Sequence, residues 1–270
     1  MFQSKWTYIG AVIIAVFALA AIFAPWLAPY NPYDMRLAEQ LSLPTLEHFM
    51  GQDANGVDIF SRLMHGARIS LSVGVIVVLI SGTIGITMGL VSGYYGGWPD
   101  TILMRLVDIL MAFPGLLLAI ALVSVLGPNI LNVVIALTVL GWVSFARLVR
   151  GQVLSVKERE YIQAARTSGQ SDARIMVVHI FPNILSPVIV QATFSVAGVI
   201  IAESSLSFLG LGAPPGTPSW GAMLSEGKQV ILEAPHVSIF PGLAIMLVVM
   251  AFNFLGDGLR DRFDPKSTIN

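Results

Sequence analysis

The 270-residue sequence contains no cysteine and few charges, since only 11% of its residues are Asp, Glu, Lys or Arg. Soluble domains carry about 25% charged residues, so a water-facing surface of this length is excluded. The missing cysteines exclude disulfide bonds, thiolate metal sites and cysteine nucleophiles. The net charge of −1 gives no reason to expect a nucleic-acid partner. Hydrophobic residues, by contrast, make up 55% of the chain, and this excess predicts a polytopic membrane protein.

The familiar motifs of ATP binding, metal binding and hydrolysis are also missing. There is no G-x-x-x-x-G-K-[ST] loop, because the Gly227-Lys228 pair is followed by Gln229 and preceded by no suitable glycine. Neither H-E-x-x-H nor G-x-S-x-G occurs. The histidines show no close metal-ligand spacing: His48, His65, His179 and His236. We therefore expect no catalytic residue, no bound cofactor and no metal site in this chain.

Six apolar stretches are each long enough, at about 20 residues, to cross ~30 Å of hydrocarbon as a helix. They lack the alternation of hydrophobic and polar residues that is typical of membrane β-barrels. The expected spans are 8–27, 71–91, 102–126, 130–149, 184–202 and 237–255. The sequence therefore predicts an all-α polytopic membrane protein with six transmembrane helices.

The distribution of Lys and Arg predicts which side of the membrane each end faces. Six spans place both termini on the same side. If that side is the cytoplasm, four cations lie outside: Arg36, Arg62, Arg68 and Lys228. The others lie inside or, for Arg105, near an inner span end: Lys5, Arg105, Arg147, Arg150, Lys157, Arg159, Arg166, Arg174, Arg260, Arg262 and Lys266. This asymmetry predicts cytoplasmic N and C termini.

The inner stretch 147–182 carries six of the fifteen cations and is expected to have its own structure. Good helix formers predict a helix over 154–168, which Gly169 would end as a C′ glycine. Ser171 is then expected to cap a second helix.

On the first of these helices, Ala164 and Ala165 are expected to form a smooth patch, flanked by Tyr161 and Ile162. Such a patch suits docking of another protein. It equally suits a helix that lies on its own membrane domain, and the residues alone leave both interpretations open.

Two features within the spans require an explanation. Ser81, Gly85, Gly89, Gly93 and Gly97 recur every four residues, which favours close helix packing over a sliding surface.

Charged residues in spans are rare. Arg105 and Asp108 have the spacing of a local ion pair, which we favour over a proton relay. Glu203, followed by Ser204, lies near the outer end of the fifth span and could line a substrate path or pair with a neighbour.

The inner stretch also resembles a known motif. Gln163-Ala164-Ala165, then Gly169, then His179 to Pro182 resemble the cytoplasmic "EAA" loop of ABC-importer permeases, E-A-A, three residues, Gly, nine residues, I-x-L-P. Gln163 replaces the Glu of that pattern, and His179 and Phe181 replace its Ile and Leu.

Further blocks in order extend the resemblance to the shorter, second permease of dipeptide/oligopeptide/nickel importers. They comprise Gly51 to Asp58, Ser61 to Leu63, Gly66 to Leu71, Gly93 to Gly97, Ala112 to Pro114, Leu206 to Gly212, Pro218 to Gly221 and Phe252 to Asp261. The resemblance implies a type I ABC importer permease of MetI-like architecture, located in the inner (cytoplasmic) membrane.

The resemblance also implies partners: a second homologous permease, two ATP-binding subunits that hold ATP and Mg²⁺, and an external substrate-binding protein. The residues expected to couple the chain to the ATPase are Tyr161, Gln163, Ala164, Ala165, Gly169, His179 and Pro182. The binding protein is expected to dock on the outer segments 31–70 and 210–236. Peptides are the favoured substrate, with nickel or another metal chelate as the alternative.

Two other classes of function remain open from the residues alone. An ion-coupled secondary transporter would use Asp108 or Glu203 as its carrier group, whereas an intramembrane enzyme would need a nucleophile–base pair that we do not find. The expected organisation is a first helix with an external segment over 1–69, a permease core over 70–260 whose coupling loop covers about 150–182, and a cytoplasmic tail over 261–270.

Overall fold

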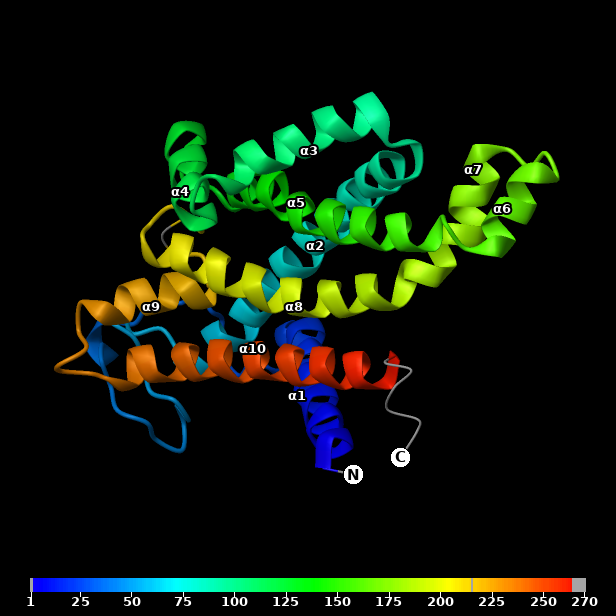
Figure 1. Cartoon of the computed structure of the whole chain (residues 1–270). Helices are drawn as coiled ribbons and strands as arrows, with labels where there is room; N and C mark the ends of the chain where they lie inside the picture. The colour runs from blue at the N-terminus through cyan, green and yellow to red at the C-terminus, as the bar shows by residue number, and fades with distance from the viewer. Residues whose placement is uncertain (1, 215, 264–270) are drawn as a thin grey trace.

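The computed structural model describes residues 2–214 and 216–263, and their regular secondary structure is helical. The elements in chain order are α1 (Phe2–Leu27), η1 (Leu37–Glu39), α2 (Ile59–Tyr95), α3 (Gly97–Met111), α4 (Gly115–Leu126), α5 (Ile130–Val156), α6 (Glu160–Thr167), α7 (Asp172–Arg174), the π-helix η2 (Ile175–Ile180), α8 (Phe181–Phe208), α9 (Trp220–Lys228) and α10 (His236–Phe263) (Figure 1). Among these residues, five helical segments are long and apolar enough to cross a membrane, and the bent pair α3–α4 can count as a sixth. The prediction of an all-α membrane protein is confirmed.

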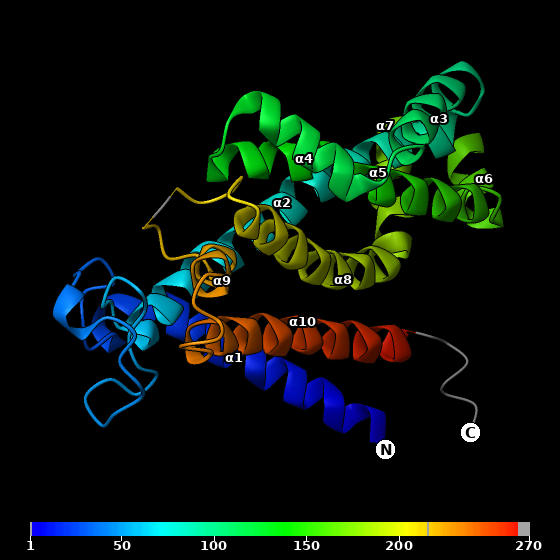
Figure 2. The same cartoon turned by 90° about the vertical axis from the view of Figure 1, so that its left-hand side faces the viewer.

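The bundle is built around α2, which packs against α1, α3, α5 and α8. α8 also packs against α10, and α9 covers both of these helices. In Figure 2, α1 begins and α10 ends at the end of the bundle that carries α6, while the connection from α1 to α2 lies at the opposite end. We refer to these as the α6 end and the α9 end. Both termini of the described chain thus share one end, and its cytoplasmic location stays a prediction.

Small residues allow α2 and α5 to approach closely. A Cβ atom added at Gly89 would lie 2.7 Å from the carbonyl oxygen of Ala146, and one added at Gly93 would lie 2.7 Å from Cβ of Val153. Gly85 lies equally tightly against the backbone of α5. A side chain at any of these positions would therefore push the two helices apart.

The glycine stripe ends earlier than the sequence indicated. α2 ends at Tyr95, and Gly96 and Gly97 have positive φ angles of 63° and 58°. L-residues rarely adopt this conformation, and the two glycines use it to turn the chain into α3. Gly97, which we expected on the packing stripe, therefore lies outside the α2–α5 contact.

The prediction of one continuous helix over 102–126 is wrong. The chain is broken between Met111 and Gly115, and α3 and α4 meet at 87°. Pro114 causes the break, because its ring removes a backbone donor and disfavours helical geometry at Phe113. As a result α3 runs beside α5, whereas α4 turns across the bundle (Figure 1).

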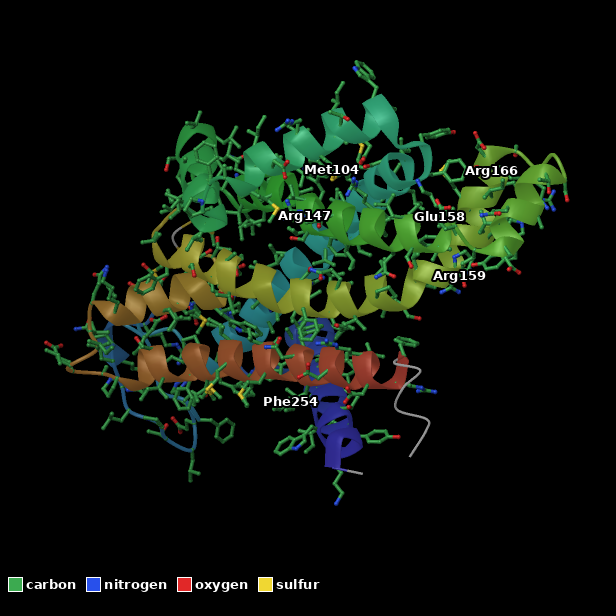
Figure 3. All side chains as sticks on the ribbon, viewed as in Figure 1. Met104, Arg147, Glu158, Arg159, Arg166 and Phe254 are labelled. Carbon is green, nitrogen blue, oxygen red and sulfur yellow. The ribbon has the colours of Figure 1, made fainter. Side chains whose placement is uncertain are left out.

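The expected ion pair between Arg105 and Asp108 is also wrong. Asp108 accepts a hydrogen bond from Nη2 of Arg147 on α5 at 3.1 Å, and Figure 3 shows Arg147 close to α3. A second arginine of α5, Arg150, holds Asp100 of α3 through two hydrogen bonds of 2.5 and 2.7 Å. The acidic residues of α3 thus attach it to α5.

The α2–α5 contact generates a stability prediction. Gly89→Ala should lower the melting temperature of the detergent-purified protein, because the new methyl group meets backbone that cannot move aside. The matched control is Gly151→Ala on α5, where an added Cβ meets nothing within 4 Å. This control should leave the melting temperature unchanged or slightly higher, since alanine favours helix by roughly 0.5–1 kcal/mol over glycine. Equal effects of the two substitutions would contradict the close contact.

Candidate functional site

The candidate coupling loop is divided differently from our expectation. We predicted one helix over 154–168, but α5 ends at Val156 and α6 begins at Glu160. Between them Lys157 donates a hydrogen bond from Nζ to the carbonyl oxygen of Gly93 at 2.9 Å, and Arg159 has an extended backbone with ψ of 145°. The contacts that hold residues 157–159 against the bundle therefore override the helix propensity of this stretch, and the helix predicted over 154–168 is interrupted there.

α6 ends as the sequence indicated. Gly169 has a φ angle of 75°, donates to the carbonyl of Arg166 at 3.1 Å, and is followed by Gln170, which donates to Ala165 at 3.2 Å. This pair of hydrogen bonds is a Schellman motif. A Cβ at Gly169 would meet nothing within 4 Å, so the position requires glycine for its backbone conformation and not for space.

One face of α6 is bound to the bundle. Ile162 is fully buried and Ala165 is 8% exposed. They belong to a cluster that draws residues from four other elements: Tyr94, Val149, Val153, Val156, Ile175, Ile180, Ile184 and Val188. Through this cluster α6 packs together with α2, α5, η2 and α8.

The opposite face of α6 is open to solvent. Tyr161, Gln163 and Ala164 are exposed, with Tyr161 at 40%. The two alanines of the motif therefore lie on different faces, because Ala165 packs inward. This corrects our expectation that Ala164 and Ala165 form one patch flanked by Tyr161 and Ile162, because Ala165 and Ile162 are buried against the bundle. Figure 1 shows α6 projecting at its end of the molecule.

Tyr94, which entered the sequence analysis only as part of the Gly93 to Gly97 block and not as a site residue, holds the loop from the α2 side. Its hydroxyl donates to Oδ1 of Asp172 at 2.6 Å. The guanidinium of Arg166 lies over its ring, 5.0 Å from the centroid, and Figure 3 labels Arg166 beside α7. Its place in the Gly93 to Gly97 block, at the end of an apolar run, is a signal that could have pointed to it. Ser171 occupies the expected N-cap position, but the structure gives its side chain no capping hydrogen bond.

His179 and Pro182 lie where the loop joins α8. Nε2 of His179 is 2.8 Å from Oε1 of Gln170, and the His179 carbonyl accepts a hydrogen bond from the side-chain Nδ2 of Asn183 at 2.7 Å. Pro182 cannot donate to the preceding turn, and the six residues Ile175–Ile180 form a π-helix upstream of it. The motif proline thus adjoins a break in the regular helix between loop and span.

Glu203 is fully buried within the described chain. Its carboxylate accepts hydrogen bonds from the hydroxyls of Ser70 at 3.2 Å and Ser207 at 2.8 Å, and that of Ser204 lies at 3.4 Å. Serine neighbours therefore satisfy Glu203, and it lines none of the cavities described here. Ser204 borders a cavity of about 340 Å³ with Phe208.

A separate groove lies between α2, α4, α5 and α8, with a volume of about 220 Å³. Its wall combines small and apolar residues with three serines, Ser81, Ser144 and Ser195. Of these, only Ser81 was singled out from the sequence, and for packing. Isolated serines in apolar spans carry too little pattern to be recognised as a group.

An ionic cluster ties the segment before α2 to α9. Arg62, 2% exposed, contacts Asp53, and its Nη1 and Nη2 donate to Glu226 at 2.5 and 3.1 Å. Asp53 Oδ1 also accepts the backbone N–H groups of Asn55 at 2.8 Å and Val57 at 3.0 Å. The turn at Gly51 to Asp58 and α9 are therefore fixed to one arginine.

This arrangement of helices is that of a known transporter fold. One chain of the inward-facing MetNI methionine ABC transporter superposes with a TM-score of 0.62, covering 76% of this chain and 98% of that one at 17% identity. Such low identity establishes the fold alone. The chain therefore shares its fold with a chain of an ABC transporter.

The chain belongs to the family of binding-protein-dependent transport system inner membrane components, whose model matches residues 85–269. Residues 1–44 match the N-terminal TM domain of oligopeptide transport permease C. The dipeptide transport system permease protein DppC of Alkalihalophilus pseudofirmus is 46% identical over 98% of this chain and 87% of its own length. The glutathione transport system permease protein GsiD of Escherichia coli is 50% identical over 95% of this chain and 85% of its own.

The buried ionic cluster predicts a large stability effect. Arg62→Ala should destabilise the protein by about 3–5 kcal/mol, because it leaves the buried Asp53 carboxylate without its cation. The control is Arg36→Ala, which removes an exposed ion pair with Asp34 and should cost less than about 1 kcal/mol. Thermal unfolding in detergent measures both. Equally small shifts for the two variants would show that the cluster does not hold this end together.

Proposed function

We propose that this chain forms one half of the translocation pore of a peptide importer in the cytoplasmic membrane, beside a second homologous permease. The support for peptide is its 46–50% identity, over at least 95% of its length, to permeases of dipeptide and glutathione transport systems. Both named substrates are small peptides.

We propose further that α6 is the contact to the energy source. The observation that carries this is the division of its two faces: Ile162 and Ala165 anchor the helix to the bundle, while Tyr161, Gln163 and Ala164 remain free to meet a partner. The chain has no phosphate-binding loop of its own. Two partner ATP-binding subunits, which hold ATP and Mg²⁺, would supply the energy.

The route from α6 to the pore is short. A displacement of α6 would move Ile162 against α5 and α8 in the shared cluster. The same two helices line the groove that contains Ser144 and Ser195, and that groove is our candidate wall of the substrate path. His179 and Pro182, at the junction with α8, would set how far the motion reaches. In this scheme Glu203, buried on serine hydroxyls, would support the structure of α8 and would not touch substrate.

The α9 end would then be the external face. This assignment rests on the excess of Lys and Arg at the α6 end, and it places the 31–70 and 210–236 segments where a substrate-binding protein delivers its ligand. The Arg62 cluster would keep these two segments in a fixed relation during delivery.

Gly169 provides a test of coupling. Gly169→Val should reduce substrate-stimulated ATPase activity and uptake at least about tenfold, because a β-branched residue resists a φ of 75° at the turn that aims α6. Gly169→Asn is the matched control and should retain most activity, since asparagine tolerates this conformation. Both variants should insert and assemble normally. Full substrate-stimulated ATPase activity in the valine variant would refute the role of the turn.

The substrate class can be tested in proteoliposomes. The chain, reconstituted with its partner permease, ATPases and binding protein, should take up labelled dipeptide only with ATP, and unlabelled peptide should compete. If a nickel chelate competes for uptake and peptides do not, the substrate is a metal chelate and not a peptide. Uptake by this chain alone, driven by a proton gradient, would overturn the importer assignment altogether.

A further inference from the structure

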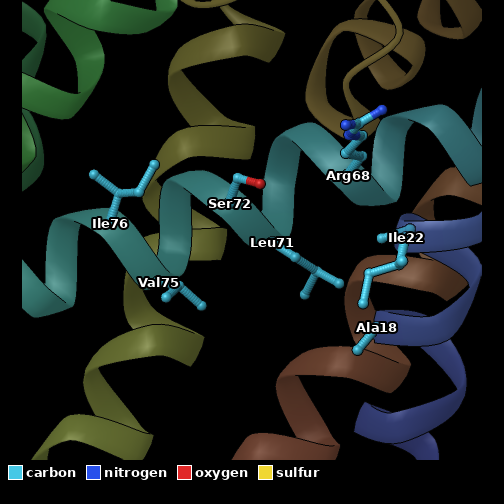
Figure 4. A pocket seen from close by; sticks show the side chains of 8 residues that line it. Ala18, Ile22, Arg68, Leu71, Ser72, Val75 and Ile76 are labelled. Atoms are coloured by element: carbon cyan, nitrogen blue, oxygen red, sulfur yellow. The ribbon is translucent and has the colours of Figure 1, made fainter.

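Two apolar grooves lie on either side of α2. The first lies between α1 and α2, has a volume of about 400 Å³, and is lined by apolar residues that include Ile22, Leu71 and Val75 (Figure 4). The second lies between α2 and α5, has a volume of about 440 Å³, and includes Val73 and Leu131. Both volumes fall within the range of about 300–1,000 Å³ that is typical of small-molecule sites.

The two grooves share one face of α2 that carries two polar side chains. Arg68, Ser72 and Ile76 of α2 line both of them. Arg68 and Ser72 are four residues apart, so they occupy the same face of the helix, as Figure 4 shows. A guanidinium and a hydroxyl therefore stand together between two apolar channels.

Arg68 differs from the other cations at this end. Arg62 is bound by Asp53 and Glu226, Arg36 pairs with Asp34, and Lys228 lies over the Phe208 ring. Arg68 has no hydrogen-bond or ion-pair partner among the residues that the structure describes. The linings of the two grooves also contain no acidic side chain within that part of the chain.

Arg68 lies on α2 at the depth expected for the headgroup of a membrane lipid. The apolar run 71–91 begins three residues after it and, at 1.5 Å per residue, is roughly 31 Å long, which equals the hydrocarbon thickness of a bilayer. Arg68 thus lies just outside the hydrocarbon, where a long cationic side chain reaches the interface. The two grooves extend from it along the apolar part of α2.

We propose that an anionic diacyl phospholipid binds astride α2, with its phosphate on Arg68 and Ser72 and one acyl chain in each groove. The planar guanidinium matches the oxygens of a phosphate, and the serine hydroxyl supplies a further donor. An anionic headgroup fits better than a zwitterionic one, because the grooves offer no carboxylate for an ammonium group.

Native mass spectrometry of the detergent-purified importer complex, titrated with phosphatidylglycerol, tests the headgroup site. R68Q should bind about tenfold more weakly, the effect of losing one charge-assisted hydrogen bond. K228Q, which removes a cation at the same end without lining either groove, should bind like the unmodified complex. Inorganic phosphate should not displace the lipid, because the acyl chains contribute to its binding. Undiminished binding by R68Q, an equal loss in K228Q, or displacement by phosphate would overturn the proposal.

Ala18 allows a separate test of the grooves, since it lines only the one between α1 and α2. A18F should weaken binding of phosphatidylglycerol but leave lysophosphatidylglycerol, with its single chain, unaffected. An unchanged affinity of A18F for phosphatidylglycerol, or an equal loss of affinity for both lipids relative to the unmodified complex, would refute the two-groove arrangement. The alternative occupant of this surface is the second permease. An introduced cysteine can test for it, because the chain has no native cysteine that would form a competing crosslink. If S72C forms a disulfide or crosslink to that permease in the assembled complex, the second permease and not a lipid occupies this surface, and the proposal is overturned.

Discussion

The close contact between α2 and α5 is the interaction on which the rest of the structure depends. In a membrane, apolar side chains gain little from leaving lipid, so helices associate through tight packing. Glycine at positions 85, 89 and 93 lets backbone meet backbone. At the end of this contact, the carbonyl of Gly93 accepts a hydrogen bond from Lys157, and the hydroxyl of the neighbouring Tyr94 donates one to Asp172. The packing of two spans therefore also positions the loop that presents α6.

Arginine residues attach peripheral segments of the chain to the bundle. At the α9 end, Arg62 joins the turn before α2 to α9. Arg150 of α5 holds α3 through Asp100, whose carboxylate also contacts Ser92. The planar guanidinium suits both tasks because it can donate two parallel hydrogen bonds to one carboxylate. The spans are poor in charge, and Arg62 and Arg150 attach parts of the chain that helix packing alone would hold less firmly.

The sequence predicted the features that depend on local requirements. Apolar runs of about 20 residues can cross a bilayer only as helices or closed barrels, and a glycine after a run of helix formers ends the helix in the left-handed conformation, as Gly169 does. The features that it did not predict depend on distant partners. Asp108 pairs with a residue 39 positions away and Tyr94 with one 78 positions away. Which face of the eight-residue α6 turns inward is likewise decided by the surfaces around it.

The break between α3 and α4 has a consequence for how the chain meets its surroundings. α4 has 12 residues and is therefore only about 18 Å long, which is too short to cross the hydrocarbon by itself. Residues 111–117, around the break, are all exposed in the isolated chain. Free backbone groups do not face lipid, and irregular backbone at membrane depth must be covered by protein or water. The short α4 and the exposed break leave the single subunit poorly matched to the bilayer. A neighbouring subunit or an aqueous channel along α3–α4 must therefore cover this stretch of backbone.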